Sequence, residues 1–237
     1  EKGKRGNCHR HFHLRRLIAF FSAKEIRKKQ EKYVKRKAKE WFASYTADYD
    51  MEDPKIALKA VHTYHVAELC QTIAESLALN EVECMAAWLS GLLHDVGRFE
   101  QIRRFNTFSD ADSIDHALLS TEILFGTKED ASCGRIRQVI LDPSWDIYLY
   151  KAIKYHSAYR LPPDLSEMEK TYCQILRDAD KIDIFRVNLE TPMEDIYNTT
   201  TETLKQAEVT SEVLQAFKER HAVLRALKKT PVDNVVG

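Results

Sequence analysis

Glycine and proline are both scarce in this chain, which has 7 Gly and 6 Pro in 237 residues. So few breaking residues argue against a β-sandwich, a barrel or a Gly-rich nucleotide loop. No G-x-G-x-x-G and no P-loop pattern occurs, which removes the two commonest nucleotide-binding motifs. No apolar run approaches the roughly 20 residues that cross a bilayer. These scarcities favour an all-α protein whose helices are joined by short connections.

The cysteines of this chain are not arranged for disulfide bonds or for a structural zinc site. The five cysteines are odd in number, scattered and never spaced C-x-x-C: Cys8, Cys70, Cys84, Cys133 and Cys173. This usage provides no disulfide framework and no zinc knuckle, and it fits a reducing compartment. We therefore expect a cytoplasmic protein.

A net charge of zero conceals an asymmetry. Residues 1–40 carry 15 Lys or Arg against 4 Asp or Glu, whereas residues 41–237 carry 21 against 32. We predict a basic N-terminal helical extension over 1–45, followed by a domain over 46–237 with its motif-bearing core at 55–190 and C-terminal helices at 191–237. A charge run is usually a solvated face, so we expect no membrane contact and disfavour nucleic acid as a partner of the extension.

Aromatic residues at both ends of the extension need burial, against the body or against a second copy in a homodimer. They are Phe20 and Phe21 at one end, and Trp41 and Phe42 at the other. The lysine-rich middle is expected to stay in water and face acidic surface, for which the C-terminal region offers Glu194 among others.

Capping residues and apolar periodicity predict the helices that follow. Asp53-Pro54 is a helix start, Asn80 with Glu83 and Ser166 with Glu169 are capping boxes, and Gly126 suits a C-terminal cap. An almost unbroken apolar stretch predicts a buried central helix. The expected helical ranges are 14–45, 53–79, 81–93, 112–125, 131–141, 144–158, 166–187 and 211–228, with another start at 191 and an irregular or short-helical segment at 98–109.

Metal-capable side chains occur at five places along these helices: His62, His94-Asp95, His116, His156 and Asp180. A lone histidine is usually a hydrogen-bonded core residue. The pair His94-Asp95 follows Leu92-Leu93, an apolar setting in which an aspartate is costly unless it is paired or metal-bound. Spacing alone cannot choose among the three aspartates at 178, 180 and 183.

The order His … His-Asp … Asp resembles the HD-domain superfamily of metal-dependent phosphohydrolases. The stretches GRFEQ at 97–101 and FSD at 108–110 look like those of a group of small bacterial members without assigned substrates. The matching segments are HTYHVA at 62–67, GLLHDVGR at 91–98 and ADKID at 179–183. The resemblance implies a helical bundle and a metal held by His62, His94, Asp95 and Asp180. It selects His62 over His65, and Asp180 over its neighbouring aspartates.

Two further segments resemble a subset of the superfamily that holds two metals. They are DHALLS at 115–120 and IKYH at 153–156. The resemblance implies that His116 and His156 complete a second metal site and that Asp95 bridges the two metals. His156 is followed by Ser157, without the His-His pair and Gly-Tyr-Pro motif of the branch that cleaves cyclic dinucleotides, so that substrate is not expected.

The function expected from this resemblance is hydrolysis of a phosphate ester or anhydride of a nucleotide-like small molecule by a metal-bound hydroxide. One or two divalent ions are implied, from among Mn, Fe, Co, Zn and Mg. Asp95 is the catalytic candidate, and Arg98, Lys181 and Arg186 are candidates for the substrate phosphate. The alternatives are a di-iron oxygenase of the same superfamily, and a nucleic-acid-binding or scaffold protein with a vestigial site.

Overall fold

The computed structural model describes residues 7–237, with side chains at residue 25 and from residue 28 onward. Every regular element in this range is helical, which confirms the predicted all-α class. No helix among these residues has both the length and the apolar character needed to cross a membrane. The elements are α1 Asn7–Thr46, α2 Pro54–Ser76, α3 Glu81–Leu93, α4 Val96–Phe105, η1 Asp110–Asp112, α5 His116–Phe125, η2 Ala131–Cys133, α6 Ile136–Val139, η3 Pro143–Trp145, α7 Asp146–Tyr155, α8 Glu167–Glu190, α9 Met193–Tyr197, α10 Thr201–Gln206, α11 Ser211–Lys218, η4 Arg225–Leu227 and α12 Asp233–Val236.

The predicted helix starts are present with their side-chain caps. Asp53 accepts a hydrogen bond from the backbone N–H of Lys55 at the start of α2. Both capping boxes are complete, Asn80 with Glu83 before α3 and Ser166 with Glu169 before α8. These contacts satisfy N–H groups that the first helical turn leaves without partners, so the local sequence fixes where each helix begins.

Four predicted helical boundaries are wrong. The range 131–141 contains only a 3₁₀ turn and the short α6, because Gly134 is extended and breaks the run. The range 211–228 ends at Lys218, because Arg220 adopts a left-handed conformation (φ 59°) that turns the chain. The helix predicted over 112–125 begins only at His116, where the side chain of Asp115 accepts from the backbone N–H of Leu118. Residues 98–109, expected to be irregular or short-helical, contain most of the ten-residue helix α4.

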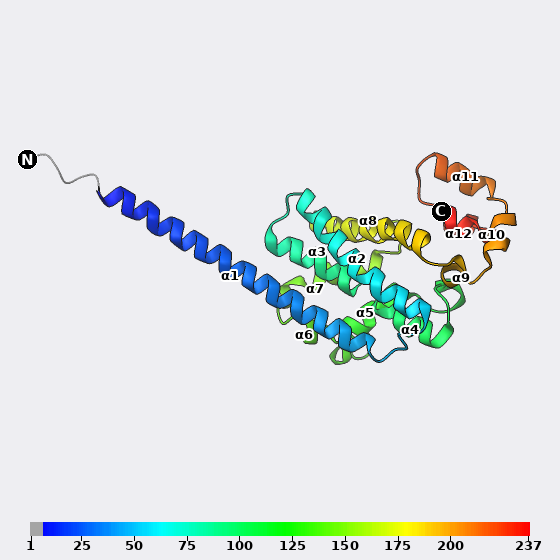
Figure 1. The fold of residues 1–237 in the computed structure, drawn as a ribbon, viewed down its shortest axis with the longest axis horizontal. Helices are drawn as coiled ribbons and strands as arrows, with labels where there is room; N and C mark the ends of the chain where they lie inside the picture. The colour runs from blue at the N-terminus through cyan, green and yellow to red at the C-terminus, as the bar shows by residue number, and fades with distance from the viewer. Residues whose placement is uncertain (1–6) are drawn as a thin grey trace, which may run out of the picture.

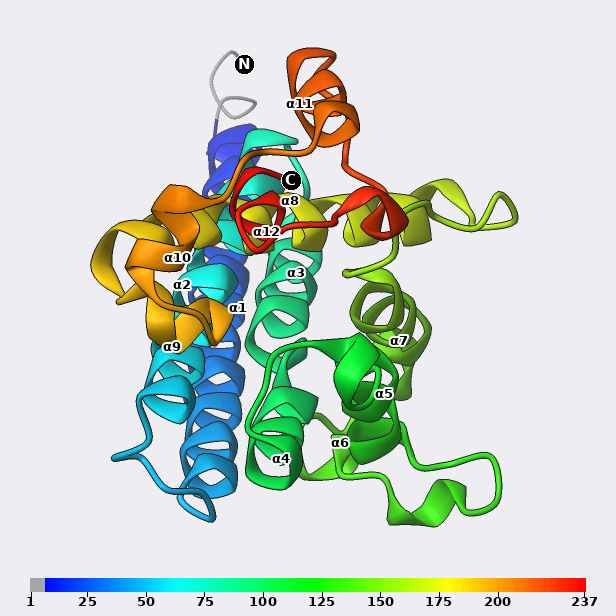
Figure 2. The ribbon, with the colours of Figure 1, turned by 90° about the vertical axis from the view of Figure 1, so that its right-hand side faces the viewer.

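Helix α3 is the centre of the bundle, as its apolar sequence predicts. It contacts α1, α2, α7 and α8, and Figure 2 shows it between α1 and α2 on one side and α7 on the other. Trp88, Leu92 and Leu93 are fully buried. Because the last turn of α3 is entirely enclosed, the His94-Asp95 pair that follows it lies inside the molecule.

The long helix α1 joins the bundle only through its C-terminal half, and its other end extends away from the body in Figure 1. Phe42 is fully buried and packs edge-on against Tyr64 and Phe99. The hydroxyl of Tyr45 donates to the carbonyl oxygen of Val96 at 2.9 Å, which ties α1 to the start of α4. The predicted burial at this end is confirmed; Phe20 and Phe21 lie outside the described side chains.

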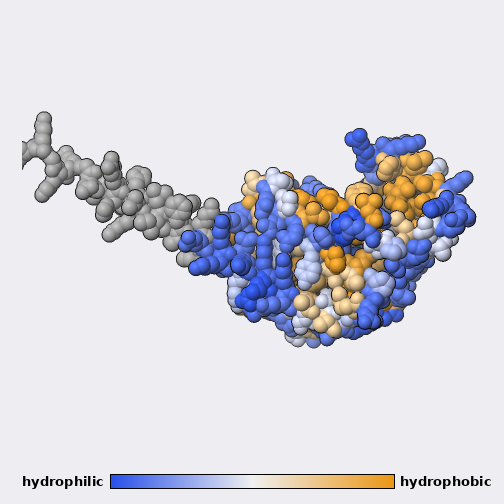
Figure 3. All heavy atoms as spheres, in the orientation of Figure 1, coloured by the Kyte–Doolittle hydropathy of each residue, from blue (hydrophilic) through white to orange (hydrophobic). Residues whose placement is uncertain are grey.

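The lysine-rich part of α1 is solvated, and Figure 3 shows hydrophilic residues over the face where this helix meets the bundle. Its ion pairs join Lys35 to Glu31, Arg36 to Glu40, and Lys39 to Glu68 on α2. The acidic residues of α9 to α12 lie at the opposite end of the molecule (Figure 1). The C-terminal region therefore does not supply the acidic surface that the basic helix is expected to face.

Candidate metal centre

Six helices place the predicted ligands in one buried volume. His62 lies within α2 and Asp180 within α8, while His116 is the first residue of α5. His94 ends α3, Asp95 precedes α4, and His156 ends α7. Helix termini bring several of these side chains to the middle of the bundle, where the four histidines and Asp95 are at most 3% exposed. The side chain of Asp180 is 22% exposed and is the most open of the six.

One group of ligands surrounds the Oδ2 side of Asp95. His62 Nε2 lies 3.0 Å from Asp180 Oδ1, and His94 Nε2 lies 3.8 Å from the same oxygen. Asp95 Oδ2 is 3.3 Å from His94 Nε2 and 3.9 Å from His62 Nε2. These four residues, predicted as the first metal site, are thus within a few ångströms of one another.

A second group lies on the Oδ1 side of Asp95. His116 Nε2 and His156 Nε2 are 3.0 Å apart, and each is 3.6 Å from Asp95 Oδ1. The two oxygens of this one carboxylate therefore face the two groups, which is the arrangement that a bridging ligand needs. A further acidic group consists of Asp110, Asp115 and His116.

All four imidazoles are held from behind through Nδ1. His94 donates to the carbonyl oxygen of Gly91 and His156 to that of Ile153, both at 2.7 Å. His62 and His116 use the carboxylates of Asp183 and Asp110 in the same way. A neutral imidazole that donates from Nδ1 presents the lone pair of Nε2. Four such lone pairs point into the centre.

The inward-facing nitrogen and oxygen atoms fit a metal cation. In two places, two atoms that both carry lone pairs lie 3.0 Å apart. They are His62 Nε2 with Asp180 Oδ1, and His116 Nε2 with His156 Nε2. His94 Nε2 and Asp95 Oδ1 are buried with no hydrogen-bond partner, a costly condition unless an ion satisfies them. Imidazole nitrogens with carboxylate oxygens suit Mn, Fe, Co and Zn.

The comparison with protein families agrees with this geometry. The model of the HD domain matches residues 60–185, which is more than half of the chain. The chain belongs to the HD domain family. No curated protein and no solved structure is similar enough to this HD protein to count as a match. HD domains bind divalent metals and are mostly metal-dependent phosphohydrolases, so membership implies hydrolase activity of this general kind.

Charges around this candidate metal centre keep its carboxylates ionised. Burial by itself raises the pKa of Asp95, but the neighbouring His94 and Lys59 hold that pKa well below its usual range. Burial likewise raises the pKa of Asp180, but the neighbouring imidazoles of His62, His94 and His156 together hold that pKa well below its usual range. Burial lowers the pKa of His116 to about 4. His116 is therefore uncharged at neutral pH, and the lone pair of its Nε2, which lies 3.0 Å from His156 Nε2, is available to a metal ion.

Lys59 is a buried cation of the candidate metal centre, and the sequence did not predict its role. It is 7% exposed, and its Nζ lies 2.7 Å from Asp95 Oδ2 and 5.4 Å from the ring centre of Phe108. The available clue was its position: a lysine three residues before His62, in the apolar run IALKAV, lies on the same helical face as that histidine.

The predicted phosphate-binding residues have different partners. Arg98 lies beside it: Nη1 donates to Asp110 at 2.9 Å, while the buried Nε has no hydrogen-bond partner and is 3.8 Å from Asp95 Oδ1. Arg186 is paired with Asp183. Lys181 is exposed and donates to the carbonyl oxygen of Arg177 at 3.3 Å. His65 is also exposed and takes no part.

Proposed function

We propose that this protein hydrolyses a phosphate ester or anhydride of a nucleotide-like small molecule, using one or two divalent metals held by His62, His94, Asp95, His116, His156 and Asp180. One observation carries the proposal: inward-facing imidazole nitrogens surround both oxygens of Asp95, and two of these buried atoms, His94 Nε2 and Asp95 Oδ1, have no hydrogen-bond partner. A divalent metal supplies a water of lowered pKa at neutral pH and neutralises charge on phosphoryl oxygens. Hydrolysis then adds water across a P–O bond, and the leaving oxygen takes a proton.

The remaining residues have roles that follow from charge and position. Asp95 is the catalytic residue, because its two oxygens serve both ligand groups. The ammonium of Lys59 and the free Nε of Arg98 both lie within 4 Å of that carboxylate. Two cations at this distance favour an anionic substrate, and hydrogen bonds from cationic groups to phosphate are among the stronger ones. Asp180, the most exposed ligand, lies where substrate enters.

The experiment begins with metal analysis of protein purified without added metal. The same sample is then assayed against a panel of nucleotides and other phosphoesters. The matched pair of variants is Asp180→Asn and Asp178→Asn: both lie on α8, but Asp178 is exposed. We expect hydrolysis by the wild type and by the Asp178 variant, and loss of both metal and hydrolysis in the Asp180 variant.

Two outcomes contradict the proposal. A metal-loaded protein that hydrolyses nothing in the panel is not the expected phosphohydrolase. If that protein holds iron and consumes oxygen, the di-iron oxygenase alternative replaces the proposal, since the same histidines and carboxylates are suitable iron ligands.

A further inference from the structure

The four inward-facing histidines are not held in the same way. His94 and His156 each donate to a backbone carbonyl three residues earlier on their own helix. His62 and His116 instead donate to carboxylates from other elements, Asp183 on α8 and Asp110 on η1. Each of the two ligand groups around Asp95 therefore contains one carboxylate-backed histidine.

Each backing carboxylate is fixed in turn by an arginine. Arg186 donates from Nε and Nη2 to the two oxygens of Asp183, at 2.7 and 2.8 Å. Arg98 donates to Asp110 at 2.9 Å, and Gln101 donates to the same oxygen at 2.9 Å. We name these chains the α8 relay (Arg186–Asp183–His62) and the loop relay (Arg98–Asp110–His116).

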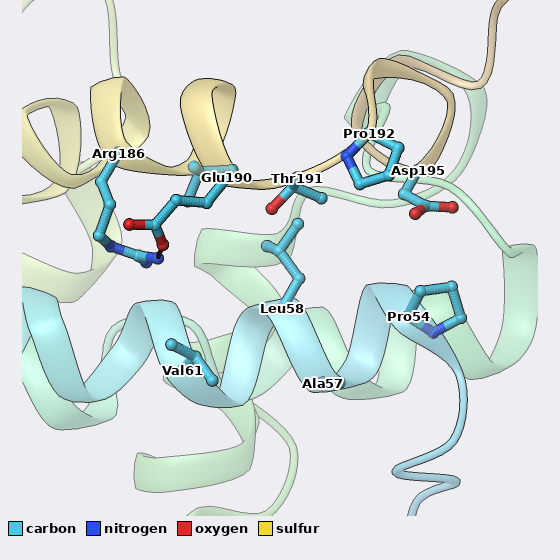
Figure 4. Close-up of a pocket in the computed structure, with 10 residues that line it drawn as sticks. Pro54, Ala57, Leu58, Val61, Arg186, Glu190, Thr191, Pro192 and Asp195 are labelled. Carbon is cyan, nitrogen blue, oxygen red and sulfur yellow. Dashed lines mark hydrogen bonds and ion pairs between the residues drawn. The ribbon is translucent and has the colours of Figure 1, made fainter.

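The two relays end in different surroundings. Arg186 also donates to Glu190 at 2.6 Å, and both side chains line a groove of about 340 Å³ between α2 and the junction of α8 with α9 (Figure 4). Arg98 is 13% exposed and lies 5.9 Å from the ring centre of Phe108. The α8 relay therefore reaches a surface groove, whereas the loop relay stays beside the candidate metal centre.

We propose that Asp183 and Asp110 are positioning residues that set the affinities of two metal positions independently, one relay for each. This inference rests on the proposed function in taking the centre to bind metal. A carboxylate behind an imidazole fixes the ring and increases the basicity of the opposite nitrogen, more than a neutral carbonyl does. The α8 relay acts through His62 on the first position, and the loop relay acts through His116 on the second.

The test measures binding of Co²⁺ by equilibrium dialysis over a range of free Co²⁺ concentrations. We expect two ions per chain in the wild type. Asp183→Ala should weaken one position and Asp110→Ala the other, each by about 10- to 100-fold. The control is Asp233→Ala: Asp233 is as buried as Asp183 and accepts hydrogen bonds from Thr210 and Thr230 near the C-terminus. It should lower the thermal unfolding temperature but leave both affinities unchanged.

Conservative variants distinguish positioning from general support of the fold. Asp183→Asn and Asp110→Asn keep an oxygen that accepts from Nδ1 but remove the charge. We expect affinities between those of the wild type and the alanine variants. We also expect a visible Co²⁺ spectrum closer to that of the wild type, because the ring orientation is retained.

Several results overturn the inference. They are wild-type affinities in both alanine variants, equal weakening of both positions by either variant, and a wild type that binds a single ion per chain. A wild type that binds no metal overturns the proposed function as well. If the relay variants behave as expected but no phosphoester is hydrolysed, the proposed function fails and the relays stand.

Discussion

Replacing Gly97 with alanine should displace one end of the metal centre. A Cβ on Gly97 would lie 2.5 Å from the carbonyl oxygen of His116, and 2.7 and 2.8 Å from the N and Oγ of Ser120. Ordinary contact begins at 3.4 Å, so α4 and α5 must separate by about 0.9 Å, well above the roughly 0.5 Å that a preorganised site tolerates. His116 begins α5 and moves with it.

The stability cost can be estimated from the same clash. Overpacking against backbone atoms costs about 1–3 kcal/mol, and the better helix propensity of alanine offsets up to about 1 kcal/mol. A net loss of about 1–2 kcal/mol lowers the unfolding temperature by roughly 2–8 °C in a protein of this size. The Co²⁺ affinity of the position served by His116 should fall, while the position served by His62 is retained.

Gly134→Ala is a matched control. Its Cβ would meet the backbone of residues 124–126 at the same 2.5, 2.7 and 2.8 Å, but at the opposite end of α5. Thermal unfolding in the presence of a chelator should reveal similar destabilisation of both variants, and Co²⁺ dialysis should separate them. If Gly97→Ala binds Co²⁺ as the wild type does, or if both variants lose the same position, the reasoning is refuted.

Three further predictions concern the centre and the core. The Asp95→Asn variant should keep the helical circular dichroism signal but hydrolyse substrate more than about 100-fold more slowly. This loss exceeds the one expected when a residue behind a metal ligand is changed. Wild-type turnover in this variant contradicts the prediction. Because burial lowers the pKa of His116 from 6.5 to about 4, the unfolded chain binds that proton first. The metal-free protein should lose up to about 3 kcal/mol of stability as the pH falls from 6.5 towards 4; urea titrations at several pH values test this, and an equal slope in His116→Asn refutes it. Phe42→Ala should lower the free energy of unfolding by about 3–5 kcal/mol. Phe185→Ala should hardly change it, because Phe185 is 72% exposed. Equal unfolding temperatures of the two variants contradict this.

The sequence was sufficient where local chemistry decides the structure. The capping boxes at Asn80 and Ser166 form because the residues that make them are three positions apart. The predicted helix at 131–141 failed for a local reason as well, since a single extended glycine at position 134 interrupts an otherwise helical pattern.

The surroundings of the ligands could not be predicted, because they depend on chain segments far apart. Asp110 precedes α5 in a short 3₁₀ turn, and nothing in its spacing indicates that it bonds the side chain of His116. Lys59 resembles any other helical lysine until α3 and α4 place Asp95 beside it. Asp183 lies 121 residues from the histidine that it holds.

The separation of these partners along the chain has a consequence for folding. His116 and His156 are 40 residues apart, whereas His62 and Asp180 are 118 apart. Closing the longer loop costs more chain entropy and delays contact formation. The ligand group on the Oδ1 side of Asp95 can therefore assemble while the bundle is incomplete, and the group on the Oδ2 side must wait for α8 to dock. During synthesis on the ribosome, the group on the Oδ1 side can exist before α8, the last of the six helices, has emerged.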